Sequence, residues 1–172
     1  MTTINYILLG VFSWMISIYT LNITTLYGQT ISLGTCQGKK ILLVNIATNS
    51  PYAAAQLPEL EQFYQTHKDS IVVIGFPSNS FGNEPLDNDE LKTVLKNTYQ
   101  LSFPVVEKTD VTGMDAQPVY KWLQSDADNG VAGAILKDDF QKFLINKDGT
   151  LSGIFSSKTS VLDSKVQTAI QY

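Results

Sequence analysis

The sequence predicts an α/β domain in which a central mixed sheet is flanked by helices and preceded by an N-terminal β-hairpin. Residues 41–47 and 71–76 are continuous apolar runs, which are typical of strands buried on both faces of a sheet. Residues 53–67 between them carry apolar side chains at helical spacing. The three segments therefore form a predicted β-α-β unit.

The elements at the start of the domain follow from local patterns. Residues 19–25 and 29–33 alternate apolar and polar side chains around Gly28, which predicts the β-hairpin. The helix at 53–67 contains Pro58. Because proline is best tolerated in the first turn of a helix, it predicts that this helix begins near that residue.

The next elements follow the second buried strand. Residues 87–98 have a helical pattern with Asp87 or Asn88 as the predicted N-cap. Residues 103–106 are expected to form a short strand. Residues 118–123 begin with a proline and are expected to form a helix whose apolar face lies in the core.

The C-terminal part predicts a second hairpin and a closing helix. Residues 143–146 and 151–155 flank a Lys-Asp-Gly turn, and residues 161–170 have a helical pattern. This order of elements matches a thioredoxin-like architecture with an N-terminal extension.

Composition limits the class of protein. The chain has 172 residues, of which 44% are hydrophobic and 16% charged, so it is long enough for one domain with a core and is not disordered. Its net charge of −4 argues against a nucleic-acid partner, because nucleic-acid binding needs a basic surface.

The chain has a single cysteine, Cys36, and a single histidine, His67. One cysteine excludes an intramolecular disulfide and a cysteine-based zinc site. We therefore expect no metal and no cofactor.

Residues 1–16 form a predicted hydrophobic segment, and residues 17–172 form the domain. The first 38 residues contain no charged side chain, and residues 7–18 are densely apolar. That length suits a signal peptide and is short for a membrane span, although a preceding positive charge and a small-residue cleavage pattern are lacking. We expect an exported protein, periplasmic or membrane-anchored through residues 1–16. The alternative is a buried N-terminal extension on a cytoplasmic protein.

Five segments, in order, resemble motifs of the glutathione peroxidase family. Residues 38–48 resemble GKxLLIVNVAS, residues 75–85 resemble GFPCNQFGxQEP, and residues 99–105 resemble YGVTFPV. Residues 140–145 resemble FTKFLI, and an Asp-Gly pair at 148–149 follows. The resemblance extends from about residue 17 to the C-terminus. It implies a thioredoxin-like fold and a family activity in which thiols reduce hydroperoxides.

The segment between Asp126 and Ile135 is short where the tetrameric members of this family have a long loop. In this respect the chain resembles the smaller, thiol-dependent branch, which implies a monomer.

The residues that carry catalysis in the family are replaced here. The resemblance places Ser50 at the peroxidatic cysteine or selenocysteine, Ser80 at a glutamine, and Asp138 and Asp139 at a tryptophan and an asparagine. The usual resolving cysteine corresponds to Leu95. A register shift of one residue around Ser50 changes nothing, because no cysteine follows Cys36.

These replacements affect the chemistry directly. Peroxide reduction needs a soft nucleophile that becomes a sulfenic or selenenic acid, and a serine hydroxyl has no equivalent oxidised state. The two aspartates are expected to bring negative charge toward the same place, which disfavours an anionic nucleophile.

Three other functions are conceivable for these residues: hydrolysis, cation binding and thiol redox chemistry. Hydrolysis by Ser50 needs a base, and His67 is expected to be an exposed surface residue with no Gly-x-Ser-x-Gly elbow around the serine. The oxygens of Ser50, Ser80, Asp138 and Asp139 suit a hard cation, but adjacent aspartates usually mark a solvated loop or a cap. The thiol of Cys36 lies near two lysines that favour the thiolate, yet this position is not catalytic in the family.

The sequence thus predicts a non-catalytic, peroxidase-like binding or structural module. The first alternative is a peroxidase that reduces hydroperoxides with a thiol reductant in the response to oxidative stress, as family membership implies, with Cys36 as its candidate thiol. The second is a different activity in the altered pocket.

Overall fold

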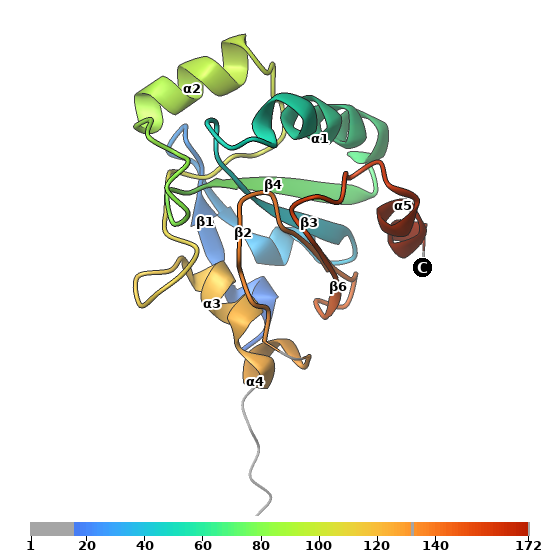
Figure 1. Ribbon diagram of the computed structural model, residues 1–172. Helices are drawn as coiled ribbons and strands as arrows, with labels where there is room; N and C mark the ends of the chain where they lie inside the picture. The colour runs from blue at the N-terminus through green and yellow to red at the C-terminus, as the bar shows by residue number, and fades with distance from the viewer. Residues whose placement is uncertain (1–15, 132, 172) are drawn as a thin grey trace, which may run out of the picture.

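A four-stranded mixed sheet lies at the centre of the chain (Figure 1), and the computed structural model describes residues 16–131 and 133–171. The strand order is β4-β3-β5-β6, where β3 pairs parallel with β4 and antiparallel with β5, and β5 pairs antiparallel with β6. The bounds are β3 (Lys40–Ile46), β4 (Ile71–Pro77), β5 (Lys142–Ile145) and β6 (Leu151–Phe155). A separate antiparallel hairpin joins β1 (Asn22–Thr24) to β2 (Thr30–Ser32). The predicted fold class is confirmed.

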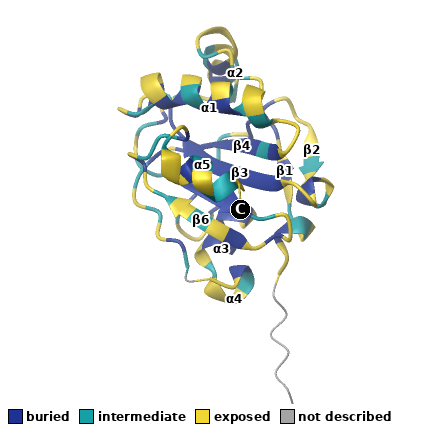
Figure 2. Ribbon diagram, turned by 90° about the vertical axis from the view of Figure 1, so that its right-hand side faces the viewer, coloured by how far each residue is buried: buried dark blue, intermediate teal, exposed yellow. Residues whose placement is uncertain are grey.

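Helices cover both faces of this sheet. They are α1 (Ala53–His67), α2 (Asn88–Asn97), α3 (Pro118–Gln124), α4 (Asp126–Asn129) and α5 (Ser164–Gln171), with 3-10 turns η1 (Ile18–Thr20) and η2 (Leu33–Cys36). In Figure 2 the central strands β3 and β4 are dark blue and the outer sides of the helices are yellow, so the core lies between the helices and the sheet.

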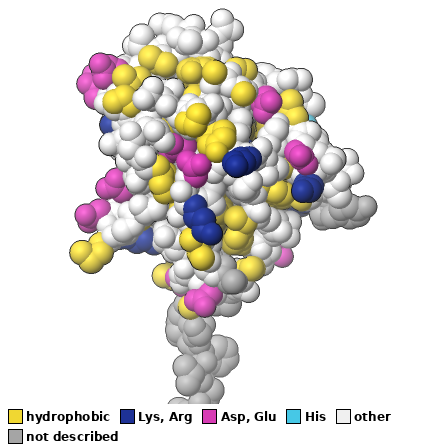
Figure 3. Space-filling model, viewed as in Figure 1, with side chains coloured by type: hydrophobic (Ala, Val, Ile, Leu, Met, Phe, Trp, Pro, Cys, Tyr) yellow, Lys and Arg dark blue, Asp and Glu magenta, His cyan; other side chains and the backbone are white. Residues whose placement is uncertain are grey.

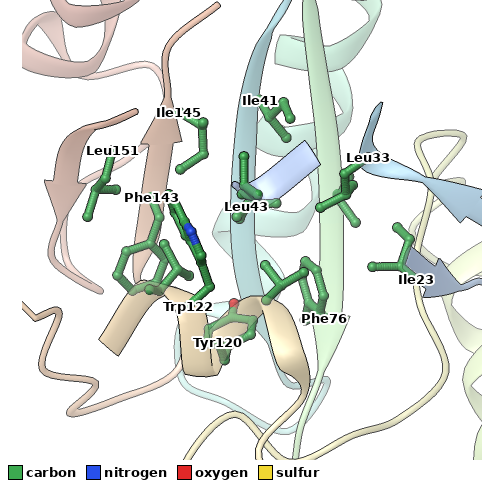
Figure 4. Close-up of a cluster of buried hydrophobic side chains, with 14 of the residues drawn as sticks. Ile23, Leu33, Ile41, Leu43, Phe76, Tyr120, Trp122, Phe143, Ile145 and Leu151 are labelled. Carbon is green, nitrogen blue, oxygen red and sulfur yellow. The ribbon is translucent and has the colours of Figure 1, made fainter. Parts of the chain in front are cut away.

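Two hydrophobic clusters lie on opposite faces of the sheet, because successive side chains of a strand point to opposite sides. Ile41 and Leu43 of β3 pack in one cluster with the α3 residues Tyr120 and Trp122 (Figure 4). Leu42 and Val44 of the same strand pack in the other cluster. That second cluster includes buried residues from α1, α2 and α5.

The start of α1 differs from the prediction. Pro58 lies inside the helix, which begins at Ala53 rather than near the proline. The turn before it holds the first residues in place, since the Ala53 amide donates to the Ser50 carbonyl at 3.0 Å and the Gln56 amide to the Tyr52 carbonyl at 2.9 Å. Leu57 and other buried side chains of α1 anchor this end of the helix in the core.

Two other predictions need correction. Residues 103–106 do not form a strand, since Val105 and Val106 make only isolated bridges to Gly75 and Thr25. The last helix begins at Ser164, not at residue 161. The short helix α4 begins the segment between Asp126 and Ile135.

The hydrophobic segment predicted at 1–16 lies outside the described residues except for Ile16. In residues 16–131 and 133–171, none of the helices has both the length and the apolar character needed to cross a membrane. Figure 3 shows acidic and basic side chains interspersed with hydrophobic ones on the face seen in Figure 1.

Candidate functional site

Ser50 lies in the turn between the C-terminal end of β3 and the start of α1. Its side chain is buried, with 6% of the residue exposed. The Ser50 amide donates to the Ala47 carbonyl at 3.2 Å, and the Ser50 hydroxyl accepts a hydrogen bond of 3.4 Å from the Tyr52 amide. Because β3 and β4 run parallel, the loop that follows β4 reaches the same edge of the sheet.

Glu84 joins this second loop to the turn that carries Ser50. Its carboxylate is fully buried and accepts hydrogen bonds from the Thr48 amide at 2.6 Å and from the Thr48 hydroxyl at 2.8 Å. The Asn49 amide also donates to the Asn83 carbonyl at 3.1 Å. The backbone around Ser50 is therefore fixed by the loop after β4.

Asp139 reaches Ser50 from the segment before β5. It is fully buried, and one carboxylate oxygen, Oδ2, accepts a hydrogen bond of 2.7 Å from the Asn83 side-chain amide. The other oxygen, Oδ1, has no hydrogen-bond partner of good geometry within the described residues. Burial raises the pKa of Asp139, and the hydrogen bond from Asn83 opposes this increase. The charges of Asp138 and Glu84 add to the increase, and the neighbouring Ser50 hydroxyl lowers the pKa.

The Asp138 carboxylate makes different contacts from the Asp139 carboxylate. It is half-buried, and its carboxylate accepts a hydrogen bond of 2.8 Å from the amide of Asp139. Burial raises the pKa of Tyr52, and the neighbouring Asp138 carboxylate adds to that increase. The Asp138 carboxylate therefore caps the next backbone amide and lies near the Tyr52 side chain.

The Ser80 hydroxyl is held by other contacts. It accepts hydrogen bonds from the Ser78 hydroxyl at 2.9 Å and from the Val111 amide at 3.0 Å. The structure thus brings Ser50 and Asp139 together, whereas Ser80 is tied to the segment that precedes α3.

Cys36, Leu95 and His67 lie apart from this group. Cys36 is buried in η2, and burial raises the pKa of its thiol. Leu95 lies in the core on α2. His67 is at the far end of α1 from Ser50, roughly 20 Å away along the helix axis.

The expectation that His67 is exposed is wrong. The residue is partly buried, because its ring stacks on Phe63 with centroids 4.3 Å apart and its Nδ1 lies 2.9 Å from the Phe63 carbonyl oxygen. A histidine held in this way and at this distance cannot serve as a base for Ser50.

Sequence reasoning missed a buried lysine next to the site. Lys142 is fully buried in β5 and donates hydrogen bonds to the Gln56 side chain and, at 2.7 Å, to the carbonyl of Phe140. Burial lowers the pKa of Lys142 to about 7, against the opposing effect of Glu59. The signal in the sequence was the lysine of the FTKFLI-like motif at residues 140–145, which stands in an otherwise apolar strand.

The described part of the chain holds no group of three or more histidine, cysteine or acidic side chains arranged to bind a metal ion. Asp138 and Asp139 make separate local contacts, and the nearby Glu84 carboxylate accepts hydrogen bonds from Thr48.

Known proteins are similar to this chain over most of its length. A sequence model described as "Glutathione peroxidase" matches residues 18–124. A protein named "Glutathione peroxidase-like peroxiredoxin GPX5" from Chlamydomonas reinhardtii is 38% identical over 141 residues, covering 81% of this chain and 86% of that protein. "Glutathione peroxidase-like peroxiredoxin 2" from Saccharomyces cerevisiae is 32% identical over 158 residues, covering 90% and 97%.

Solved structures share the architecture. "Trgpx in apo form" superposes with a TM-score of 0.68 at 31% identity, covering 91% of this chain and 96% of the other. A thioredoxin-family thiol:disulfide interchange protein from Chlorobium tepidum gives a TM-score of 0.65 at 20% identity, covering 90% and 96%. At that identity the second likeness shows the fold alone.

Proposed function

Since this chain belongs to the glutathione peroxidase family, we propose that it is a peroxidase-like protein without thiol peroxidase chemistry, which acts as a binding or structural module. The observation that carries the proposal is the pair formed by Ser50 and Asp139. An alcohol stands where the family resemblance implies a thiol or selenol, and a buried carboxyl group lies beside it.

The first reason is the chemistry of oxygen. In a thiol peroxidase the sulfur attacks the O–O bond, becomes a sulfenic acid and releases an alcohol or water. A serine hydroxyl has a much higher pKa than a thiol, whose ordinary pKa is about 8.5, and it has no stable oxidised state that a second thiol can reduce. Ser50 therefore supplies neither the nucleophile nor the intermediate.

The second reason is the surroundings of Ser50. The family residues implied at positions 80, 138 and 139 donate hydrogen bonds to the anion and the peroxide. Here the Ser80 hydroxyl is bound to Ser78 and to the Val111 amide, and Asp139 brings an acceptor. Several coordinated replacements distinguish this chain from a peroxidase altered at one position.

The alternative is a working peroxidase that uses Cys36 with a thiol reductant. The names of the relatives favour this alternative, because several of them are called peroxidases or peroxiredoxins. Two features oppose it: Cys36 is only 5% exposed, and burial raises the pKa of its thiol and so reduces the thiolate fraction.

Peroxide consumption by the purified chain tests the proposal. Hydrogen peroxide and an organic hydroperoxide are each supplied with glutathione or thioredoxin, and the peroxiredoxin from Chlamydomonas reinhardtii serves as positive control. We expect no consumption above the rate without protein. Turnover that disappears in Cys36→Ser supports the alternative, and turnover that disappears in Ser50→Ala contradicts the proposal.

We also propose that residues 1–16 direct export or anchor the domain to a membrane, and that the domain is monomeric. The apolar, uncharged character of residues 7–18 supports the first, and the short segment before Ile135 supports the second. Fractionation of cells that express the full chain or a variant lacking residues 1–16 tests export. Sedimentation of the domain tests its oligomeric state.

A further inference from the structure

A cavity of about 270 Å³ lies beside the hairpin, away from Ser50. It is bounded by the β1–β2 connection, the C-terminal half of α2 and residues 101–105. The residues that line it do not include Ser50, Ser80, Asp138 or Asp139. The cavity is therefore separate from the position of peroxidase chemistry.

Apolar side chains line the inner part of this cavity. Leu26, Leu95, Phe103 and Val105 are buried residues that border it. Tyr64 lies against Phe103 in an edge-on contact with ring centroids 5.9 Å apart. This lining suits an apolar body, since burial of apolar surface is the main source of affinity in such sites.

The charged residues at the cavity are both lysines. Lys92 and Lys96 lie one turn apart on α2, and no aspartate or glutamate is among the lining residues, although the whole chain has a net charge of −4. Lys92 pairs with Asp89 at 2.7 Å. Lys96 is exposed and makes no salt bridge within residues 16–131 and 133–171.

We propose that this cavity binds a small organic carboxylate with an apolar body, whose carboxylate lies at Lys96 and Lys92 and whose body contacts Leu95 and Phe103. The proposal rests on the combination of buried apolar side chains and two cationic side chains of α2 among the residues that line the cavity. Binding of this kind needs no thiol, so the proposal holds whether or not the chain reduces peroxides.

Leu95, which lines this cavity, stands at a position to which the family resemblance assigns a role. The family resemblance puts a resolving cysteine at this position, whereas here the side chain is an aliphatic part of the cavity wall. Replacing a thiol by leucine adds apolar surface to the wall. The altered residue therefore contributes to ligand binding in the proposed site.

Titration of the full chain with octanoate, followed by amide NMR shifts and calorimetry, tests the proposal. Octanol is the uncharged comparison ligand. We expect saturable binding of one octanoate, shifts confined to residues around the cavity, weaker binding of octanol, and an affinity for octanoate that falls with added salt.

Variants distinguish a built site from general apolar binding. The double variant Lys92→Gln/Lys96→Gln is expected to bind octanoate about threefold to tenfold more weakly, as for exposed ion pairs. Lys121→Gln, on the exposed side of α3, is the matched control and is expected to bind as the wild type does. Leu101→Trp is expected to obstruct the cavity and abolish binding, with circular dichroism confirming that the variant is folded.

The proposal is overturned if octanoate does not bind, if octanol binds as tightly as octanoate, or if the double lysine variant keeps wild-type affinity. It is also overturned if the NMR shifts lie outside the residues that line the cavity.

Discussion

The Asn83 side-chain amide donates a hydrogen bond of 2.7 Å to the Asp139 carboxylate, and this bond joins the loop after β4 to the segment before β5. Asp139 stands where the family resemblance implies an asparagine. The loop thus satisfies one oxygen of a buried carboxyl group, while the Ser50 hydroxyl lies beside that group. The side chain at position 139 therefore accepts a hydrogen bond from Asn83, whereas the resemblance implies an asparagine there that donates a hydrogen bond to an anion.

Restoring a thiol at position 50 is expected to recover little activity. In a Cys36→Ser background, Ser50→Cys places the only thiol of the chain beside Asp139. Ionised Asp139 raises the pKa of such a thiol, because like charge disfavours the thiolate. Adding Asp139→Asn is expected to lower the thiol pKa and to increase the rate of peroxide reduction.

Thiolate absorbance as a function of pH and peroxide consumption measure these two effects. Asp115→Asn, an exposed loop change, is the control for loss of one negative charge. Rapid turnover by Ser50→Cys with Asp139 intact would show that the pocket still supports a thiolate.

Asp139 is expected to make stability depend on pH. In the unfolded chain Asp139 ionises near its ordinary pKa of 3.8, whereas in the folded chain its pKa is raised by burial. Between these two pKa values the folded state binds more protons than the unfolded state, so the free energy of unfolding falls as pH rises through this window.

The Asp139→Asn variant removes this dependence and keeps an acceptor for Asn83. Urea unfolding at about pH 3 and about pH 7 should show a larger stability gain of the variant over wild type at the higher pH. An equal difference at both pH values would mean that Asp139 ionises normally in the folded protein.

Lys142 is expected to have the opposite effect on stability. Its pKa is lowered from 10.5 to about 7 in the folded chain. Between these values the unfolded state binds more protons, so the free energy of unfolding rises with pH through this window, by about 1.4 kcal/mol per unit of pKa difference.

Lys142→Met keeps a long side chain in β5 and removes the charge. Denaturant unfolding between about pH 7 and about pH 10 should give a flatter pH profile for this variant than for wild type. Lys165→Met, at an exposed position, should leave the profile unchanged. A wild-type profile that stays flat across this range would show that Lys142 titrates normally.

Cys36 is expected to be unreactive in the folded protein. It is buried in η2 and its thiol pKa is raised by burial, so the accessible thiolate is scarce. Labelling with a disulfide reagent should be slower in the native protein than in denaturant by at least roughly tenfold. Equal labelling rates in the native and denatured protein would support the alternative of a peroxidase that uses Cys36.

The fold was predictable wherever a local pattern determines the element. The buried strands β3 and β4 follow from continuous apolar runs, and the capping box at Asp87 fixes the start of α2. The start of α1 was not predictable, because contacts of residues 53–57 with the preceding turn and the core outweigh the local preference of Pro58.

The site was predictable in its residue types more than in its contacts. The motifs place Ser50 and Asp139 at corresponding family positions, and the structure brings them together. The bond from Asn83 to Asp139 joins residues 56 positions apart, so it depends on how the loops pack. The contacts of Ser80 depend likewise on the conformation of its loop, which the motif alone does not specify.

Hydroperoxide loss in the presence of the Cys36→Ser variant, which contains no thiol, tests the central claim most directly. With a chemical excess of reductant and substrate, we predict that peroxide disappears no faster than in buffer. Sustained catalytic consumption by this thiol-free protein, abolished by Ser50→Ala, would show that the serine site itself reduces peroxide and would contradict the account.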